Sequence, residues 1–123
     1  MPSALFGPDG RHFGWLYEGD VFDPGFHLLA FREVDDLFSA KDLRWLGPCE
    51  RGGVYDRCGG IVALVLGQPV MRVLAPRIRP ISPRLKPARQ ALPEELRDGA
   101  ILPSHLGVQK RWTGPTVTEW LGQ

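Results

Sequence analysis

The chain has 123 residues, of which 43% are hydrophobic and 24% charged, and its formal net charge is +1. This length accommodates one domain with a tail and excludes two independent hydrophobic cores, while the composition is typical of a globular protein. The longest apolar run, residues 61–66, is far too short to span a bilayer, and the first residues lack the basic start of a secretory signal. We therefore expect a cytoplasmic protein with no membrane contact.

The first half of the chain repeats one short pattern four times, at intervals of about sixteen residues. Each copy begins with an aliphatic–aromatic pair, continues through a turn-like stretch and ends in a second apolar run. The pairs are Leu5-Phe6, Val21-Phe22, Leu37-Phe38 and Val54-Tyr55. Because each copy has the composition of two short strands around a turn, the pattern predicts an all-β fold of four hairpins, eight strands in total, in a pseudo-fourfold arrangement.

Turn chemistry supports three of the four hairpins directly. Pro8-Asp9-Gly10, Asp23-Pro24-Gly25 and Cys58-Gly59-Gly60 supply the fixed or positive φ that a reverse turn needs. The third copy has Ser39-Ala40-Lys41-Asp42 instead, without glycine or proline, and its spacing from Phe38 to Trp45 is shorter than that from Phe6 to Trp15. The third copy is therefore the least regular of the four.

Two sets of equivalent side chains predict how the copies pack. The second apolar runs align as Trp15, Ala30, Trp45 and Ala63, and this alternation of large and small side chains predicts a filled layer near the axis. The aromatic members of the pairs, Phe6, Phe22, Phe38 and Tyr55, are interpreted as core rather than as a ligand cage, because an aromatic at every equivalent position of a repeat is most often buried.

After residue 67 the repeat stops, and we divide the chain into residues 1–67, 68–93 and 94–123. The middle region begins with a predicted edge strand over 68–74 and continues as a proline-rich strap over residues 76–93, which is extended because prolines recur through it. The last region is predicted to contain a helical turn at 94–97 and a short terminal helix, since Thr116 and Glu119 have the spacing of a capping box. Trp112, Trp120 and Leu121 predict that this tail packs back on the repeat.

The four copies, each with an aliphatic–aromatic pair, a turn containing Asp or Gly and a second apolar run, resemble the bacterial 4-fold β-flower proteins over roughly residues 4–67. The proline-rich stretch and the tryptophan-containing end are similar as well. The resemblance implies four hairpin petals. It brings no assigned activity and no catalytic residues to carry over.

Polar side chains near the petal turns form the one candidate enzymatic cluster: Asp9, His12, Asp23, His27, Asp42 and Asp56. If all turns gathered at one end, these groups would offer a metal site or an acid–base pair for a small hydrolase. The alternative, which we favour, is that each aspartate bonds the backbone of its own turn. We therefore assign no catalytic, metal or cofactor residue. Ser104-His105 is not read as a nucleophile and base, because adjacent residues rarely have that geometry.

The strap carries the candidate interaction residues Arg77, Arg79, Arg84, Lys86 and Arg89, and residues 68–93 contain no acidic side chain. Such a run either binds a partner or follows a phosphate backbone, but the strap has no aromatic residue on which a base would stack. We expect a non-catalytic structural or protein-interaction module, with a homodimer among its forms. A hydrolase or metal-binding enzyme and a nucleic-acid binder are the alternatives. Cys49 and Cys58 are expected to be free thiols.

Overall fold

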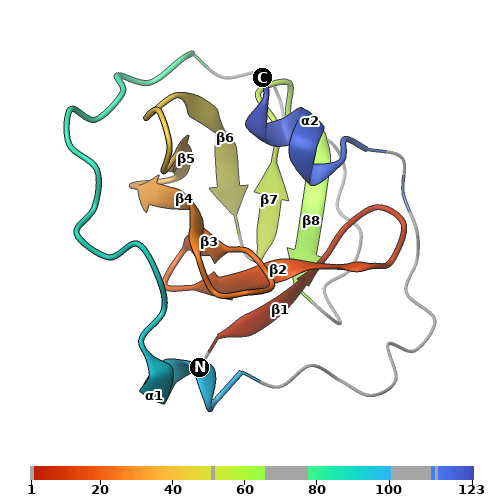
Figure 1. Cartoon of the computed structure of the whole chain (residues 1–123). Coiled ribbons are helices and arrows are strands. Elements are labelled where there is room, and N and C mark those ends of the chain that lie inside the picture. Colours follow the sequence, from red (N-terminus) through yellow and green to blue (C-terminus); the bar gives the residue numbers. More distant parts are fainter. Residues whose placement is uncertain (1, 51, 66–77, 101–111, 113) are drawn as a thin grey trace.

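The computed structural model describes residues 2–50, 52–65, 78–100, 112 and 114–123. Within these residues the chain forms eight strands and two short helices (Figure 1). Each strand pairs antiparallel with the next along the chain, and the first pairs with the last, so the sheet closes into a barrel. The predicted all-β fold of four hairpins is confirmed. The elements are β1 (Ser3–Phe6), β2 (His12–Tyr17), β3 (Asp20–Phe22), β4 (Leu28–Glu33), β5 (Asp36–Ser39), β6 (Trp45–Glu50), β7 (Gly53–Tyr55), β8 (Ile61–Val65), α1 (Glu94–Arg97) and α2 (Val117–Leu121).

The four petal turns share one closing hydrogen bond and one positive φ. In each, the N–H of the first residue donates to the carbonyl of the last, as from Gly7 to Arg11 at 3.0 Å and from Ser39 to Arg44 at 2.8 Å. The next-to-last residue always has a positive φ, and the four are Gly10, Phe26, Leu43 and Gly59. In the third petal Leu43 takes this conformation, with φ of 64°, in place of a glycine. The third hairpin therefore forms although its sequence lacks the usual turn residues.

Each petal also contains a β-bulge in its second strand. The register of every hairpin skips one residue between the aliphatic and the aromatic member of the pair. The extra residues of the second strands are Phe13, Leu29, Leu46 and Val62. This bulge changes the alignment of the copies. The residues that pair with the four aromatics are His12, Leu28, Trp45 and Ile61.

The predicted equivalence of Trp15, Ala30, Trp45 and Ala63 is therefore wrong. Ala30 and Ala63 are equivalent to Gly14 and Gly47, which pair with Leu5 and Leu37. Trp45 pairs with Phe38 and so lies two positions before Gly47, whereas Trp15 lies one position after Gly14. The third turn has one residue more than the others. The alternating layer of tryptophan and alanine does not exist.

Neighbouring petals approach each other closely at these small residues. A Cβ atom added at Gly14 would collide with the carbonyl oxygen of Phe22 in the second petal. The equivalent atom at Gly47 would collide with the carbonyl oxygen of Tyr55 in the fourth petal, and Gly47 also has a φ of 137°. Backbone contact between petals thus requires glycine at these positions.

The first strand of each petal buries both of its faces. Its aliphatic residues, Leu5, Val21, Leu37 and Val54, gather in one cluster with the bulge residues Phe13, Leu46 and Val62. Adjacent residues of a strand point to opposite faces, so the aromatic residues lie on the other side of the sheet. Phe6, Phe22, Phe38 and Tyr55 are all buried, which confirms their interpretation as core.

Helix α2 closes the aliphatic cluster at one end of the barrel. The Trp120 side chain is 0% exposed, belongs to that cluster, and contacts the ring of Phe13 at 5.9 Å between centroids. Its indole N–H donates to the carbonyl of Leu46 at 3.2 Å, so the one polar atom of the buried ring is satisfied. The side chain of Thr116 and that of Glu119 form the predicted capping box, which starts the helix at this point.

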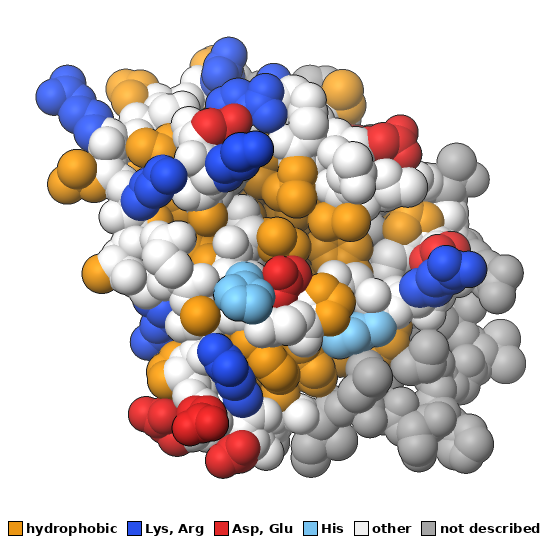
Figure 2. Space-filling view, viewed as in Figure 1, with side chains coloured by type: hydrophobic (Ala, Val, Ile, Leu, Met, Phe, Trp, Pro, Cys, Tyr) orange, Lys and Arg blue, Asp and Glu red, His pale blue; other side chains and the backbone are white. Residues whose placement is uncertain are grey.

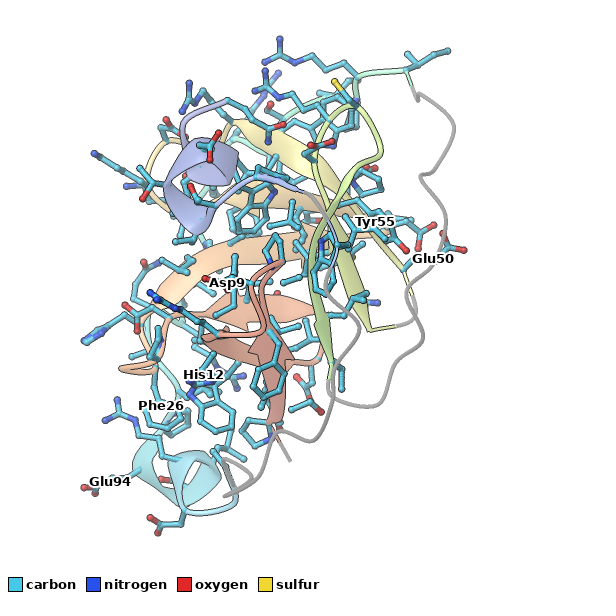
Figure 3. The ribbon with its side chains drawn as sticks, turned by 90° about the vertical axis from the view of Figure 1, so that its right-hand side faces the viewer. Asp9, His12, Phe26, Glu50, Tyr55 and Glu94 are labelled. Atoms are coloured by element: carbon cyan, nitrogen blue, oxygen red, sulfur yellow. The ribbon has the colours of Figure 1, made fainter. Side chains whose placement is uncertain are left out.

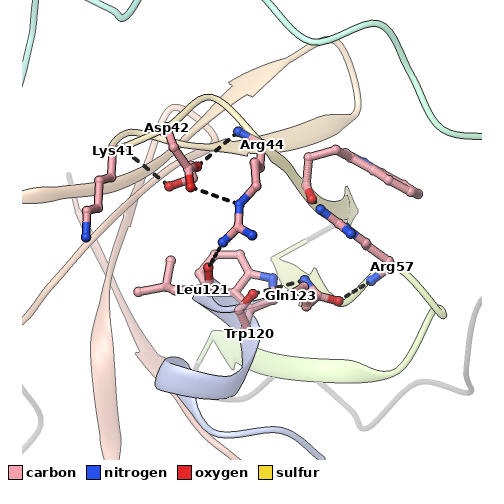
Figure 4. Close-up of polar contacts among 9 residues, drawn as sticks. Lys41, Asp42, Arg44, Arg57, Trp120, Leu121 and Gln123 are labelled. Carbon is pink, nitrogen blue, oxygen red and sulfur yellow. Dashed lines mark hydrogen bonds and ion pairs between the residues drawn. The ribbon is translucent and has the colours of Figure 1, made fainter.

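Polar contacts tie the end of α2 to the third and fourth petals (Figure 4). Arg44 donates to the carbonyl of Leu121 at 3.0 Å, and the amide of Gln123 donates to the carbonyl of Leu46 at 2.6 Å. The backbone N–H of Arg57 donates to the side-chain oxygen of Gln123 at 2.9 Å. These bonds fix the helix across the barrel end, since they reach it from two different petals.

The strap joins the second petal at its far end. Ala91 forms a bridge with His27, the N–H of Leu28 donates to Gln90, and the N–H of Leu92 donates to Phe26. The Leu92 side chain is fully buried among the aromatics of the outer face. The predicted helical turn at 94–97 follows at once as α1, so the strap is anchored here before the chain turns away.

Two expectations fall outside the described residues, namely the edge strand over 68–74 and the Ser104-His105 pair. The boundaries that divide the chain into residues 1–67, 68–93 and 94–123 stay a prediction. In the part of the chain that the structure describes, neither helix has the length or apolar character to cross a bilayer.

Replacing Trp120 with alanine should lower the free energy of unfolding by about 3–5 kcal/mol, because it empties a fully buried site at the barrel end. Thr118→Ala, at an exposed position of the same helix, is the matched control and should change it by no more than about 0.5 kcal/mol. Urea denaturation followed by circular dichroism measures both. Equal midpoints for the two variants would contradict a role of Trp120 in the core.

Candidate interaction surface and polar sites

The turn aspartates all bond the backbone of their own turns. Each carboxylate oxygen accepts an N–H from two or four residues further along, at distances between 2.8 and 3.2 Å. The pairs are Asp9 with Arg11, Asp23 with His27, Asp42 with Arg44, and Asp56 with both Cys58 and Gly60. The bonds to the N–H two residues on, at Asp9, Asp42 and Asp56, have the geometry of an Asx turn, whereas Asp23 bonds the N–H four residues on.

The structure does not bring the six predicted polar residues together. Asp23 and His27 lie 3.5 Å apart, but both belong to one exposed turn. Asp9 and Asp42 pair instead with arginines of their own turns, Arg11 and Arg44. Among the residues described, no three His, Cys, Asp or Glu side chains lie close enough to hold a metal ion. The turn carboxylates therefore act on their own hairpins.

His12 differs from the other turn residues. Its side chain is half buried, its Nε2 atom is inaccessible and without a hydrogen-bond partner, and its ring packs edge-on against Trp15 at 4.8 Å. Burial lowers the pKa of the His12 imidazole, and a hydrogen bond to the backbone of Gly14 opposes the shift. Desolvation disfavours the charged form, so the ring is neutral at neutral pH.

The basic side chains of the strap point to solvent. Arg79, Arg84, Lys86 and Arg89 are exposed, while Arg77 lies outside the described residues. The guanidinium of Arg89 lies over the ring of Tyr17 at 5.7 Å, so this arginine also holds the strap to the barrel. Figure 2 shows Lys and Arg side chains mixed with hydrophobic ones along the upper left of the molecule, where the strap runs in Figure 1.

Hydrophobic side chains on the same segment are exposed as well. Across the described ranges, the large hydrophobic residues that are mostly exposed are Val34 (83%), Ile78 (95%), Ile81 (96%) and Leu85 (82%). Val34 stands in the β4–β5 turn and Ile81 in the strap, yet both line one groove of about 480 Å³. Other residues of the groove are Phe38 from β5 and Arg84 from the strap. We call this surface, Val34 with Ile78, Ile81 and Leu85, the strap surface.

Arg79 of the strap lies near Arg57 of the fourth petal. Burial lowers the pKa of the Arg57 guanidinium, and the positive charges of Arg79 and Arg44 lower it further. Arg57 also donates to the carbonyl of Trp45 at 2.7 Å, which holds it in place. A set of arginines close enough to disturb one another favours an anion or an acidic side chain from a partner.

Sequence reasoning selected the charged residues of the strap and missed its aliphatic ones. Ile78, Ile81 and Leu85 have no periodicity that distinguishes surface from core in a proline-rich segment. A usable signal was present, because four basic and no acidic residues lie between positions 78 and 92, which is unusual for a buried segment. The exposed Val34 was missed for another reason, because a valine followed by two aspartates is interpreted simply as part of a turn.

A family model described as "4-fold beta flower protein" matches residues 3–121. The match therefore extends from the first petal through the strap to helix α2. No curated protein and no solved structure matches the chain.

The lowered pKa of His12 predicts how stability changes with pH. Folding suppresses proton binding at this ring, so the neutral ring contributes fully to the free energy of unfolding above the pKa of His12 in the unfolded chain, about 6.5. This contribution is lost as pH falls from there toward the pKa of the folded state. Wild type should therefore lose stability relative to His12→Leu between about pH 7.5 and 5. Urea denaturation of both proteins across this range measures the difference, in which shared carboxylates cancel. Parallel pH profiles would show that His12 is not desolvated.

Proposed function

The chain belongs to the 4-fold beta flower protein family, and on that premise we propose that it is a non-catalytic protein-interaction module whose partner binds the strap surface. The observation that carries the proposal is the exposure of four large aliphatic side chains. Val34 and Ile81 line one groove, and Ile78 and Leu85 stand in the strap three and four residues from Ile81. Solvent contact with large aliphatic side chains is unfavourable, and a patch of them rimmed by polar groups is typical of an interface.

The charges around the strap surface define the chemistry of the partner. Arg79, Arg84 and Lys86 alternate with the exposed aliphatic residues, and Arg57 lies near Arg79. A partner segment that carries acidic side chains beside apolar ones matches both features. Electrostatic attraction would speed the encounter, while aliphatic contacts in the groove would hold the complex.

The strap is suited to binding because its conformation is restrained before a partner arrives. Pro80, Pro83 and Pro87 limit the backbone to extended conformations, and Ala91 and Leu92 anchor the following residues on the second petal. Ordering a segment on binding costs free energy, so a segment that is already restrained binds more tightly for the same contacts.

The proposal places the protein in the cytoplasm, which its cysteines support. Cys49 is half buried and Cys58 exposed, and neither forms a disulfide. Disulfides form mainly in oxidising compartments, so two cysteines outside any disulfide fit a reducing one.

A second copy of the chain is one partner of the required chemistry. The carboxylates of Glu94, Glu95 and Asp98 are exposed around α1 and oppose the charge of the strap. Light scattering of the purified protein tests this. If the protein is monomeric at micromolar concentration, the partner is a different protein and not a second copy of this chain.

Changing Ile78, Ile81 and Leu85 together to serine should abolish capture of the partner from the native cell, with a loss of at least tenfold. All three side chains are exposed, so we expect the variant to fold with unchanged stability. The matched control replaces three exposed residues outside the strap and α1, as Arg11→Ser, Lys41→Ser and Thr118→Ser, and should capture the partner normally. Quantitative mass spectrometry of affinity-purified samples measures the ratio.

Equal capture by the serine variant and wild type would overturn the proposal. Nuclease treatment and a salt series separate it from nucleic-acid binding. A protein partner survives nuclease and retains apolar contacts as salt rises, whereas contacts with phosphates weaken steeply.

A further inference from the structure

A pocket lies where the third petal turn, the second petal and α2 meet. Its volume is about 450 Å³, within the range of small-molecule sites. Leu28 and Leu29 line it from the second petal, and Leu121 lines it from α2. The third turn contributes the exposed side chain of Lys41. None of the described residues lines both this pocket and the groove of the strap surface, so a ligand here leaves that groove open.

The third turn is held at the pocket from two sides. The backbone N–H of Ala40 donates to the carbonyl of Leu29 at 3.0 Å, which ties the turn to the second petal. The guanidinium of Arg44 donates to the carbonyl of Leu121 at 3.0 Å, which ties the turn to α2. The backbone that carries Lys41 is therefore positioned before any ligand arrives, and less ordering is needed when one binds.

Lys41 differs from the basic residues of the other petal turns. Arg11 of the first turn pairs with Asp9 at 3.4 Å, and Arg57 of the fourth turn donates to the carbonyl of Trp45 at 2.7 Å. Among the residues that the structure describes, no carboxylate lies within ion-pair distance of the Lys41 ammonium. Figure 4 likewise shows no bond from the Lys41 amine to the other residues drawn. This ammonium is therefore available to a ligand.

The lining of the pocket has a net positive charge. Asp42 and Arg44 also line it, but the carboxylate and the guanidinium lie 2.8 Å apart, so their charges offset each other and the charge of Lys41 remains. Figure 3 shows Glu50 and Glu94 well away from α2, so these two carboxylates do not oppose an anion at the pocket. A small anion is therefore attracted to this site.

We propose that this pocket binds a small carboxylate with a branched aliphatic body. The carboxylate pairs with the Lys41 ammonium, which is a compact charge with three donors and accepts an anion from several directions. The aliphatic body packs against Leu29 and Leu121, whose side chains are half buried and so leave part of their surface open to a ligand. Removal of this apolar surface from water adds to the attraction between the charges.

Two probes with one carbon skeleton test the proposal. Isocaproate carries a carboxylate on a branched aliphatic body, and isocaproamide has the same body with an uncharged amide. Two-dimensional ¹H–¹⁵N spectra of the full chain, titrated with each probe, should show shifts at Leu29, Lys41 and Leu121. At low ionic strength we expect isocaproate to bind about two- to fivefold more tightly, as one exposed ion pair provides. This preference should decrease as salt is added.

Lys41→Gln removes the charge, so the preference for isocaproate should disappear while the affinity for isocaproamide is unchanged. Lys41→Arg keeps a positive charge at the same place and should retain most of the preference. Arg11→Gln is the matched control, because Arg11 is an exposed basic residue of another petal turn and does not line the pocket. This control should bind both probes as wild type does.

The proposal is overturned if neither probe shifts the pocket residues of wild type, if wild type binds the two probes equally, or if the preference persists in Lys41→Gln. The variant with serine at Ile78, Ile81 and Leu85 should keep the preference for isocaproate. The control of that experiment, which carries Lys41→Ser, should lose the preference and still capture the partner. These two variants separate the pocket from the proposed partner surface.

Discussion

Four short hairpins form one barrel because none of them can bury its own apolar side chains. Each first strand has three or four residues, with an aliphatic side chain on one face and an aromatic one on the other. The aliphatic residues, Leu5, Val21, Leu37 and Val54, meet in one cluster, and every hairpin depends on the other three to cover that face. The bulge and the small residue that follows it allow the petals to approach closely enough for this contact.

Closure of the barrel leaves the cluster open at one end, and α2 covers that end. Trp120 fills it with a single large ring whose N–H is bonded to Leu46. Because the helix has only five residues, it has little stability alone, and its position depends on this ring and on bonds from Arg44 and Arg57. The strap is anchored in a similar way on the outer face, where Leu92 packs among the aromatics. Both segments outside the repeat thus complete the burial that the petals begin.

Positions where the copies agree build the fold, and positions where they differ carry the candidate chemistry. The turn aspartates stand first in the turns of the second and fourth petals and at other positions in the first and third, and each bonds the backbone of its own turn. His12 replaces an apolar residue in one petal only, and Val34 is exposed at a connection where it lies beside Ile81 of the strap. Because the fold is pseudo-symmetric, each such residue of a petal can be compared with the residues at the equivalent positions of the other petals.

The sequence alone was sufficient for the eight strands, the petal turns with Asp9, Asp23 and Asp56, the burial of the four aromatics, the turn at α1 and the capping box of α2. These features depend on local patterns of two to four residues, which are visible in the chain. The alignment of the copies required the tertiary structure, because a bulge adds a residue without any sequence mark and Leu43 adopts a conformation usually left to glycine. Only the tertiary structure reveals the groove at Val34 and Ile81 and the unpartnered nitrogen of His12, because burial and hydrogen bonding depend on which distant segments meet.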